Sequence, residues 1–208
     1  GTALNLVFTI TLSYGLSREG LKGRTFLTGF VFFTMLFSGG MIPTFILVKG
    51  VGLIDSRWAM VLPCLINTWN LLIMRNFFYG IPKSLEEAAV IDGANDAQVL
   101  VKIVLPLSKA SIATIGLFYA VSHWNAWFDA MLYINTTALL PMQNILRNII
   151  TAASSIGDLG AEAYNSLDVV PPSQAIRAAT IVITTLPILV AYPFVQKYFV
   201  KGVMVGSV

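Results

Sequence analysis

The sequence predicts an all-α integral membrane protein, and three observations support this fold class. Of its 208 residues, 56% are apolar and only 11% are charged, against about a quarter charged in ordinary globular domains. Clusters of charged residues alternate with uncharged stretches of 17 residues or more. About 20 mostly apolar residues span a bilayer as a helix. A soluble fold of this size buries roughly two-thirds of its surface, which is too little to hide this apolar content.

We therefore expect a bundle of five transmembrane helices within a single domain, residues 1–208. Each predicted span is an uncharged stretch between charged residues. Prolines inside these stretches do not argue against them, because packed membrane helices tolerate proline. The five stretches are Gly1–Ser17, Thr25–Val48, Trp58–Met74, Ala110–Phe128 and Ala178–Gln196.

The distribution of Lys and Arg predicts the orientation of these spans. Nine of the 13 basic residues fall on the side of the membrane that includes the C-terminal residues, and the other side has four, namely Lys49, Arg57, Arg147 and Arg177. Basic residues concentrate in cytoplasmic connections. We therefore expect the C-terminus to be cytoplasmic and Gly1, five spans earlier, to lie outside.

Two connections are too long to be simple turns. The external one covers about residues 136–177. Within it Met142, Ile145, Leu146 and Ile149 recur at helical spacing, which predicts a helix over Pro141–Ile150 that lies on the membrane surface or tucks back into the bundle. The polar stretch Ser154–Pro172 follows, and a packed external cap is as good an interpretation of this connection as a functional loop.

The cytoplasmic connection contains a loop, about residues 82–106, that reads as two short helices around a turn. Ser84 followed by Glu87 fits a capping box, in which each side chain bonds a free backbone N–H. Asp92-Gly93 is expected to end the first helix, because glycine readily adopts the left-handed conformation found at helix ends. Asn95 or Asp96 can cap the second helix. A small, exposed helix-turn-helix of this kind is suited to docking into a partner.

This loop resembles the coupling loop of the membrane subunit of bacterial ABC importers. That loop has the pattern E-A-A, three residues, G, nine residues, then I, any residue, L-P, and all seven fixed positions occur here at the same spacing. The residues that match are Glu87, Ala88, Ala89, Gly93, Ile103, Leu105 and Pro106, and the acids Glu86 and Asp92 complete the candidate ATPase-docking set.

The resemblance implies a mechanism and a set of partners. The coupling loop would sit in a groove of a cytoplasmic ABC ATPase, with Glu87 facing a basic residue there; the alternative is that Glu87 only caps its helix. Two ATPase subunits, a second homologous permease and an external substrate-binding lipoprotein or periplasmic protein would complete the transporter. The chain would be a multi-pass protein of the bacterial cytoplasmic (inner) membrane, surrounded by lipid. Family members typically have six spans, so we expect one further helix before Gly1.

No cofactor is expected on this chain itself. It lacks the G-x-x-x-x-G-K-[ST] phosphate loop, so ATP would be bound by the partner ATPase. A lone His123 and a lone Cys64 offer no metal-ligand cluster. No motif predicts catalysis, and the dispersed charge gives no nucleic-acid footprint. We therefore expect a transporter subunit and not an enzyme.

The cargo is also inferred from resemblance. Ser17-Arg18, Gly23-Arg24 and Tyr198–Gly202 are similar to the carbohydrate-uptake, maltose-permease-like class of these permeases. Ile91–Asp96 and Leu117–Phe128 look like its aldouronate or multiple-sugar subgroup. This implies a permease that imports sugars or oligosaccharides. Two alternatives remain: the same architecture importing peptides, amino acids or another small solute, and an ion-coupled secondary transporter that uses Asp129.

Polar and aromatic residues within the spans are candidates for the translocation path. Sugars bind through aromatic faces and through hydrogen bonds to amides and acids, and ionisable groups inside a membrane are costly unless they have a function. The competing interpretation is that the aromatics anchor the membrane interface and the amides bond neighbouring helices. The candidates are Trp69, Asn70, His123, Trp124, Asn125, Trp127 and Asp129.

Overall fold

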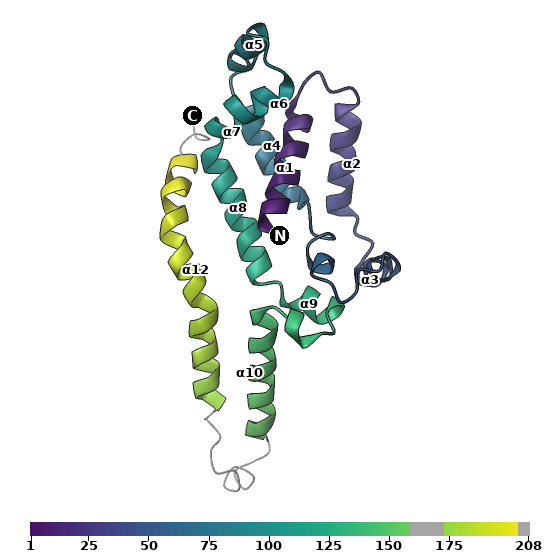
Figure 1. Ribbon diagram of the computed structural model, residues 1–208, viewed down its shortest axis with the longest axis vertical. Helices are drawn as coiled ribbons and strands as arrows, with labels where there is room; N and C mark the ends of the chain where they lie inside the picture. The colour runs from purple at the N-terminus through teal and green to yellow at the C-terminus, as the bar shows by residue number, and fades with distance from the viewer. Residues whose placement is uncertain (159–172, 204–208) are drawn as a thin grey trace. The chain divides into compact units, whose positions relative to one another are not determined.

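The computed structural model describes residues 1–158 and 173–203, and these residues form helices joined by short connections, with no strand among them (Figure 1). The all-α class is thereby confirmed. In chain order the elements are α1 (Thr2–Ser17), α2 (Arg24–Leu36), α3 (Met41–Gly50), η1 (Arg57–Met60), α4 (Thr68–Tyr79), α5 (Lys83–Ile91), α6 (Asp96–Val99), the π-helical η2 (Leu100–Val104), α7 (Leu105–Leu107), α8 (Lys109–Trp124), α9 (Trp127–Tyr133), η3 (Thr137–Leu139), α10 (Met142–Asp158) and α12 (Ser173–Val203).

The chain divides into two compact units, and each is described by itself. Unit 1 comprises residues 1–44, 61–123 and 195–208, and unit 2 comprises residues 45–60 and 124–194. The assignment of residues 1–208 to one permease domain stays a prediction.

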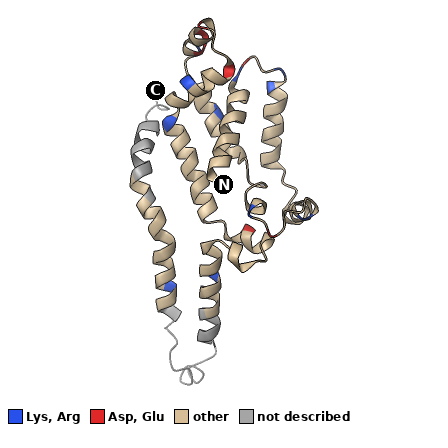
Figure 2. Ribbon diagram, viewed as in Figure 1, with Lys and Arg blue, Asp and Glu red and all other residues tan. Residues whose placement is uncertain are grey.

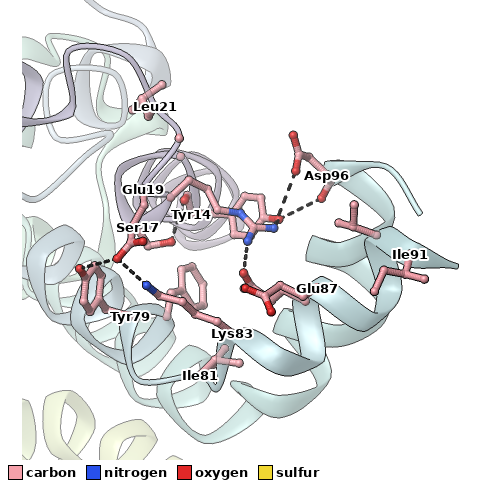
Figure 3. Close-up of a pocket in the computed structure, with 16 residues that line it drawn as sticks. Tyr14, Ser17, Glu19, Leu21, Tyr79, Ile81, Lys83, Glu87, Ile91 and Asp96 are labelled. Carbon is pink, nitrogen blue, oxygen red and sulfur yellow. Dashed lines mark hydrogen bonds and ion pairs between the residues drawn. The ribbon is translucent and has the colours of Figure 1, made fainter. Parts of the chain in front are cut away.

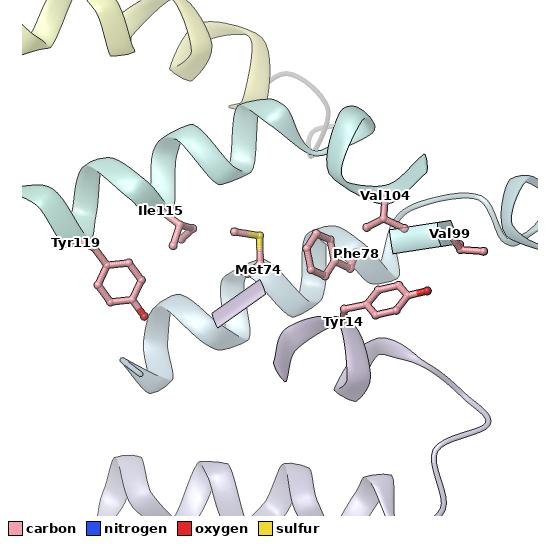
Figure 4. Packing of buried hydrophobic residues seen from close by; sticks show 7 residues of the cluster. All are labelled: Tyr14, Met74, Phe78, Val99, Val104, Ile115 and Tyr119. Atoms are coloured by element: carbon pink, nitrogen blue, oxygen red, sulfur yellow. The ribbon is translucent and has the colours of Figure 1, made fainter. Parts of the chain in front are cut away.

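The core of unit 1 lies where α1, α4, α8 and the segment from α6 to η2 meet. Its buried side chains are Tyr14, Met74, Phe78, Val99, Val104, Ile115 and Tyr119 (Figure 4). Because Val99 and Val104 come from the segment 82–106, part of that segment belongs to the core of the unit.

A buried polar stripe on α1 complements this apolar core. Asn5, Thr9 and Ser13 are spaced four residues apart, so they share one face of the helix, and all three are at most 1% exposed. Asn5 Nδ2 donates to the Cys64 carbonyl (2.8 Å) and Ser13 Oγ to the Leu71 carbonyl (3.0 Å). Thr9 bonds the Tyr119 hydroxyl (2.7 Å). These bonds fix α1 to α8 and to the chain that enters α4.

Unit 2 has a small core of its own, formed by Val48, Ala59 and Tyr133. The rings of Phe45 and Tyr133 stack with centroids 6.1 Å apart. α10 is helical as predicted from the spacing of its apolar residues, while its relation to the membrane stays a prediction. Of the connection 136–177, which is predicted to be external, residues 159–172 lie outside the described residues.

Among the described residues no single helix is long and apolar enough to cross a membrane by itself. Two bent pairs have sufficient length and apolar content together: α2 with α3, bent by 112°, and Asp96–Leu107 with α8, bent by 84°. Shorter apolar helices are Thr2–Ser17 and Ala175–Val190. The first and last predicted spans therefore coincide with continuous helices.

The other three predicted spans are not continuous helices. In Thr25–Val48 the chain leaves the helix after Leu36 and re-enters it at Met41. Gly40 between them has φ = +87°, a conformation that glycine adopts readily, and Pro43 lacks the N–H that a continuous helix would need. The prediction of a continuous span rested on the uncharged, apolar content of the stretch, which does not reflect the effect of this glycine and this proline on the backbone.

The third and fourth predicted spans break for related reasons. In Trp58–Met74 the chain forms η1, then irregular structure around Pro63, and becomes α-helical only at Thr68. In Ala110–Phe128, α8 ends at Trp124 and α9 begins at Trp127. There the Trp127 N–H bonds the Asn125 carbonyl (2.8 Å), a tight turn that replaces the helical bond.

Candidate functional site

The coupling loop, residues 82–106, begins with α5, which Pro82 precedes directly. The expected capping box of Ser84 and Glu87 is wrong, because no side chain caps this helix. α5 begins at Lys83, two residues earlier than the box requires, so Ser84 already lies in the first turn. Proline is the N-cap residue, and its fixed φ suits the entry to a helix.

The end of α5 agrees with the prediction. Asp92 is the C-cap and Gly93 follows with φ = +85°. The Ala94 N–H bonds the Ala89 carbonyl (2.9 Å) and the Gly93 N–H bonds the Val90 carbonyl (3.0 Å), the two bonds of a Schellman motif. Gly93 thus produces the sharp turn, and Ala89 and Ala94 both pack against the unit 1 core.

The second helix starts with a true capping box. The Gln98 N–H donates to Asn95 Oδ1 (2.9 Å), and the Asn95 N–H donates to Gln98 Oε1 (3.0 Å). Of the two predicted caps, Asn95 or Asp96, the structure selects Asn95. α6 is only four residues long and continues into the π-helical η2 and then α7.

The last three motif residues lie in this continuation. Ile103 and Leu105 are half-buried, and Pro106 is exposed. Pro106 cannot donate the helical bond to residue 102, and irregular hydrogen bonding just before a proline is a common response. The helix passes through Pro106, and it breaks two residues later at Ser108, whose ψ is 15°.

The two faces of α5 differ in what they contact. Glu86 and Ala89 lie half-buried against their own unit, whereas Glu87, Ala88 and Asp92 are exposed and Ile91 is 85% exposed. None of the nine α5 residues is buried. Four of the candidate docking residues, Glu87, Ala88, Asp92 and Gly93, therefore form an accessible surface at the turn.

Acidic residues concentrate at this end of unit 1. Every Asp and Glu of the unit lies on α5, on α6 or in the loops next to them, as Figure 2 shows for the described residues. They are Glu19, Glu86, Glu87, Asp92 and Asp96. Glu19 and Glu86 are paired with Lys83 and Arg18, so it is the exposed acids Glu87 and Asp92 that favour a basic residue in a partner.

A cavity of about 890 Å³ lies between α5, the end of α4 and the loop after α1 (Figure 3). Arg18 and Glu19 contribute from the loop, and Lys83 and Glu86 contribute from α5. Arg18 Nη1 forms an ion pair with Glu86, and Lys83 Nζ lies 2.5 Å from Glu19 Oε1. These two ion pairs, Arg18–Glu86 and Glu19–Lys83, are called the double ion pair below.

The exposed member of the double ion pair is formed over a wide pH range. The bond from Lys83 lowers the pKa of the Glu19 carboxyl, and the same bond raises the pKa of Lys83. Glu19 therefore stays charged down to pH values below its ordinary pKa of about 4.3, and Lys83 stays charged to values above about 10.4. At neutral pH both charges are present.

Sequence reasoning named Glu86 but missed its partner Arg18, and it missed Glu19 and Lys83. The only signal was the position of Arg18, a cation directly after a predicted span. Arg18 and Glu86 are 68 positions apart, and no local sequence pattern predicts a contact at that separation.

Three translocation-path candidates lie in unit 1. Trp69 is 60% exposed and Asn70 is buried, both near the start of α4. His123 Nε2 lies 2.9 Å from Asn5 Oδ1, so it joins the buried polar stripe of α1. None of the three lines the cavity beside the coupling loop.

The other four candidates lie in unit 2. Trp124 Nε1 donates to the Thr184 carbonyl of α12 (3.1 Å), and Arg147 stacks on the Trp127 ring with its Cζ atom 4.1 Å from the centroid. Asn125 is exposed in the break between α8 and α9, and Asp129 is half-buried in α9. Because Trp124 and Trp127 already have such contacts, a structural role competes with a sugar-binding one. Their place on a translocation path stays a prediction.

No group of three His, Cys, Asp or Glu side chains that could hold a metal ion occurs in the portion of the chain with described structure.

Comparison with known proteins gives a consistent result. Residues 7–205 match the family described as binding-protein-dependent transport system inner membrane component. The polygalacturonan/rhamnogalacturonan transport system permease protein YtcP of Bacillus subtilis (strain 168) is 52% identical over 100% of this chain and 72% of its own. Protein LplC of the same organism is 50% identical over 100% of this chain and 70% of its own.

The fold has a solved counterpart as well. The crystal structure of a bacterial ABC transporter involved in the import of the acidic polysaccharide alginate contains a chain with a TM-score of 0.82 and 36% identity. The match covers 95% of this chain and 69% of that one.

Proposed function

The chain belongs to the family of binding-protein-dependent transport system inner membrane components, and we propose that its coupling loop is the surface through which a cytoplasmic ABC ATPase drives it. The family is a membrane-bound transport component rather than an enzyme, and its members work with an ATPase and a binding protein. For this chain the proposed assembly has two ATPase subunits, a second homologous permease and an external binding lipoprotein or periplasmic protein. ATP is bound by the ATPases, and this chain needs no cofactor.

One observation supports the docking role above all others: the motif residues form an exposed turn. Glu87, Ala88, Asp92 and Gly93 are accessible at the junction of α5 and α6, and Gly93 has the positive φ that this turn needs. Glu86 and Ala89 lie half-buried against unit 1. An exposed acidic turn of this kind fits a groove with a basic residue opposite Glu87.

The proposed topology follows from the charge distribution. The coupling loop and the C-terminus face the cytoplasm, where Lys and Arg concentrate, and the connection at about 136–177 faces outward. In this topology the exposed acids of the coupling loop lie at the cytoplasmic face, where an ATPase can reach them.

For the cargo we propose oligosaccharides, including those that contain uronic acids. The relatives support this choice by their names: one transports polygalacturonan or rhamnogalacturonan, and the solved counterpart imports the acidic polysaccharide alginate. These names favour sugars over peptides or amino acids. Neither alternative function, another small solute or ion coupling, has an observation in its favour.

Docking is tested by purifying the full-length chain from membranes in mild detergent and measuring how much ATPase subunit accompanies it. We expect Glu87→Ala and Gly93→Val to reduce the accompanying ATPase, the first by removing the charge and the second because a β-branched residue rarely adopts a positive φ. Gly93→Asn is the matched control, since asparagine tolerates this conformation. An unchanged amount of ATPase in both variants, or none with the wild-type chain, would reject the docking role.

A further inference from the structure

We propose that the double ion pair transmits movement of α5 to α1, so that Arg18 and Glu19 are positioning residues for transport. This inference rests on the proposed docking of an ATPase at α5. Arg18 and Glu19 are adjacent in the loop that follows α1, and their partners Glu86 and Lys83 are three positions apart in α5. Residues three apart share one helix face. That face of α5 therefore presents one negative and one positive side chain to the loop after α1, which offers the opposite charge to each.

The attachment of α5 to unit 1 is mostly polar. No α5 side chain is buried, and Ala89 is the α5 residue that packs against the apolar core. A segment with so few buried apolar contacts opens locally at a low free energy, so specific bonds matter for holding α5 in place. The double ion pair supplies such bonds.

Arg18 connects three elements. Its Nη1 pairs with Glu86 of α5, its Nη2 bonds the Tyr14 hydroxyl of α1, and the same Nη2 lies 3.8 Å from Asp96 Oδ1 at the start of α6. Tyr14 in turn donates to the Asp96 backbone carbonyl (3.2 Å). A planar guanidinium with several fixed donors suits such a junction better than lysine would. A push on α5 or α6 therefore reaches the end of α1 through one side chain.

Glu19 extends the junction to α4 and α2. Its Oε1 accepts from Lys83 (2.5 Å) and from the Tyr79 hydroxyl (3.3 Å), and Arg24 lies over the Tyr79 ring at 5.4 Å. The side chains of Glu19 and Lys83 are more than half exposed, whereas those of Arg18 and Glu86 are 25% and 17% exposed. Salt screens exposed pairs most, so Arg18–Glu86 is the principal bond of the two.

α1 is suited to carry the movement onward. It is a continuous helix of 16 residues, about 24 Å long. At intervals along it Asn5, Thr9 and Ser13 are bonded to residues 64, 119 and 71. A displacement at Arg18 is thus delivered to the chain before α4, to α4 itself and to α8. Glu87 docks the partner, and Arg18–Glu86 determines whether docking moves the membrane helices.

A charge-swap experiment tests this inference in the full transporter reconstituted in vesicles. Arg18→Glu and Glu86→Arg, each alone, place like charges together, and combining them restores opposite charges. We expect Arg18→Glu to keep the ATPase bound. Each single variant should lower substrate transport per ATP hydrolysed by at least about fivefold, and the double variant should recover most of it. Lys22→Glu, an exposed cation in the same loop, is the matched control and should have little effect.

A second readout does not depend on the ATPase. Amide hydrogen exchange of residues 83–93 in the purified chain should be faster in each single variant and return toward wild type in the double variant. Wild-type exchange in both single variants, or normal transport per ATP in both, would overturn the inference. Rescued exchange in a chain that binds no ATPase would uphold the ion pair as the α5 attachment and reject the proposed function instead.

Discussion

Asp55 organises two connections of unit 2 with one side chain. Its Oδ1 accepts the N–H groups of Asn135 (2.9 Å) and Thr136 (2.8 Å), and its Oδ2 accepts the Thr136 hydroxyl (2.6 Å). Its own N–H bonds the Tyr133 carbonyl (2.8 Å), and its φ is +59°. Only Asp and Asn among larger residues adopt this conformation easily. The carboxylate thus fixes the end of α9 against the loop before η1.

Asp55 gives a pH-dependent prediction. The Thr136 hydroxyl, the Thr136 N–H and the Asn135 N–H lower the pKa of its carboxyl. A lowered folded-state pKa means that the stabilisation is present above the unfolded value, about 3.9, and is lost as the pH falls through the lower folded value. Asp55→Asn keeps the backbone preference and removes the charge. We expect the wild-type advantage in thermal stability to be constant above about pH 5 and to shrink below about pH 4. An advantage that does not change with pH would contradict this.

At the scale of elements, the two helices of the coupling loop begin differently, and this predicts different responses to similar substitutions. Asn95→Ala removes the capping-box bond in which the Asn95 side chain accepts the Gln98 N–H, and it should cost about 1 kcal/mol of local stability. Ser84→Ala, in the first turn of α5 without a cap bond, should cost much less. Amide exchange of residues 96–99 and 83–91 in the full-length chain measures the two effects. Equal effects would mean that Ser84 caps α5 after all.

The sequence was sufficient for elements whose cause is local. Helical spacing predicted α10, and the glycine at position 93 and the choice of Asn95 or Asp96 predicted the turn and the next cap. The sequence was insufficient where the local backbone conformation determines whether a helix continues. The breaks at Gly40 and Asn125 interrupt helices within stretches whose apolar content is continuous. It also failed for Arg18–Glu86, since that bond depends on how α5 packs and not on either residue's neighbours. Half of the site, the accessible turn, was therefore predictable, and its attachment was not.

At the scale of the whole molecule, family membership and the proposed docking role of the loop together imply that a partner supplies the energy for transport. The chain contains no phosphate loop, and the acid that an ion-coupled mechanism would use, Asp129, lies in α9 among residues of unit 2. An ABC mechanism gives Asp129 no part in energy coupling. The ABC mechanism therefore predicts uptake that depends on ATP and on Glu87, whereas the ion-coupled mechanism predicts uptake that depends on an ion gradient and on Asp129.

The transporter reconstituted in vesicles with its binding protein distinguishes them. We expect uptake of an oligogalacturonide to require ATP on the ATPase side and to persist when ionophores dissipate proton and sodium gradients. Asp129→Asn should retain uptake within about twofold, because neutralising one half-buried acid leaves the ATPase contact intact, whereas Glu87→Ala should abolish most of it. A dipeptide in place of the oligosaccharide should not stimulate ATP hydrolysis. An ion-coupled carrier would be identified if uptake stops with the ionophore or with Asp129→Asn while Glu87→Ala has no effect. If the dipeptide alone stimulates ATP hydrolysis, the ABC mechanism holds and the proposed cargo is wrong.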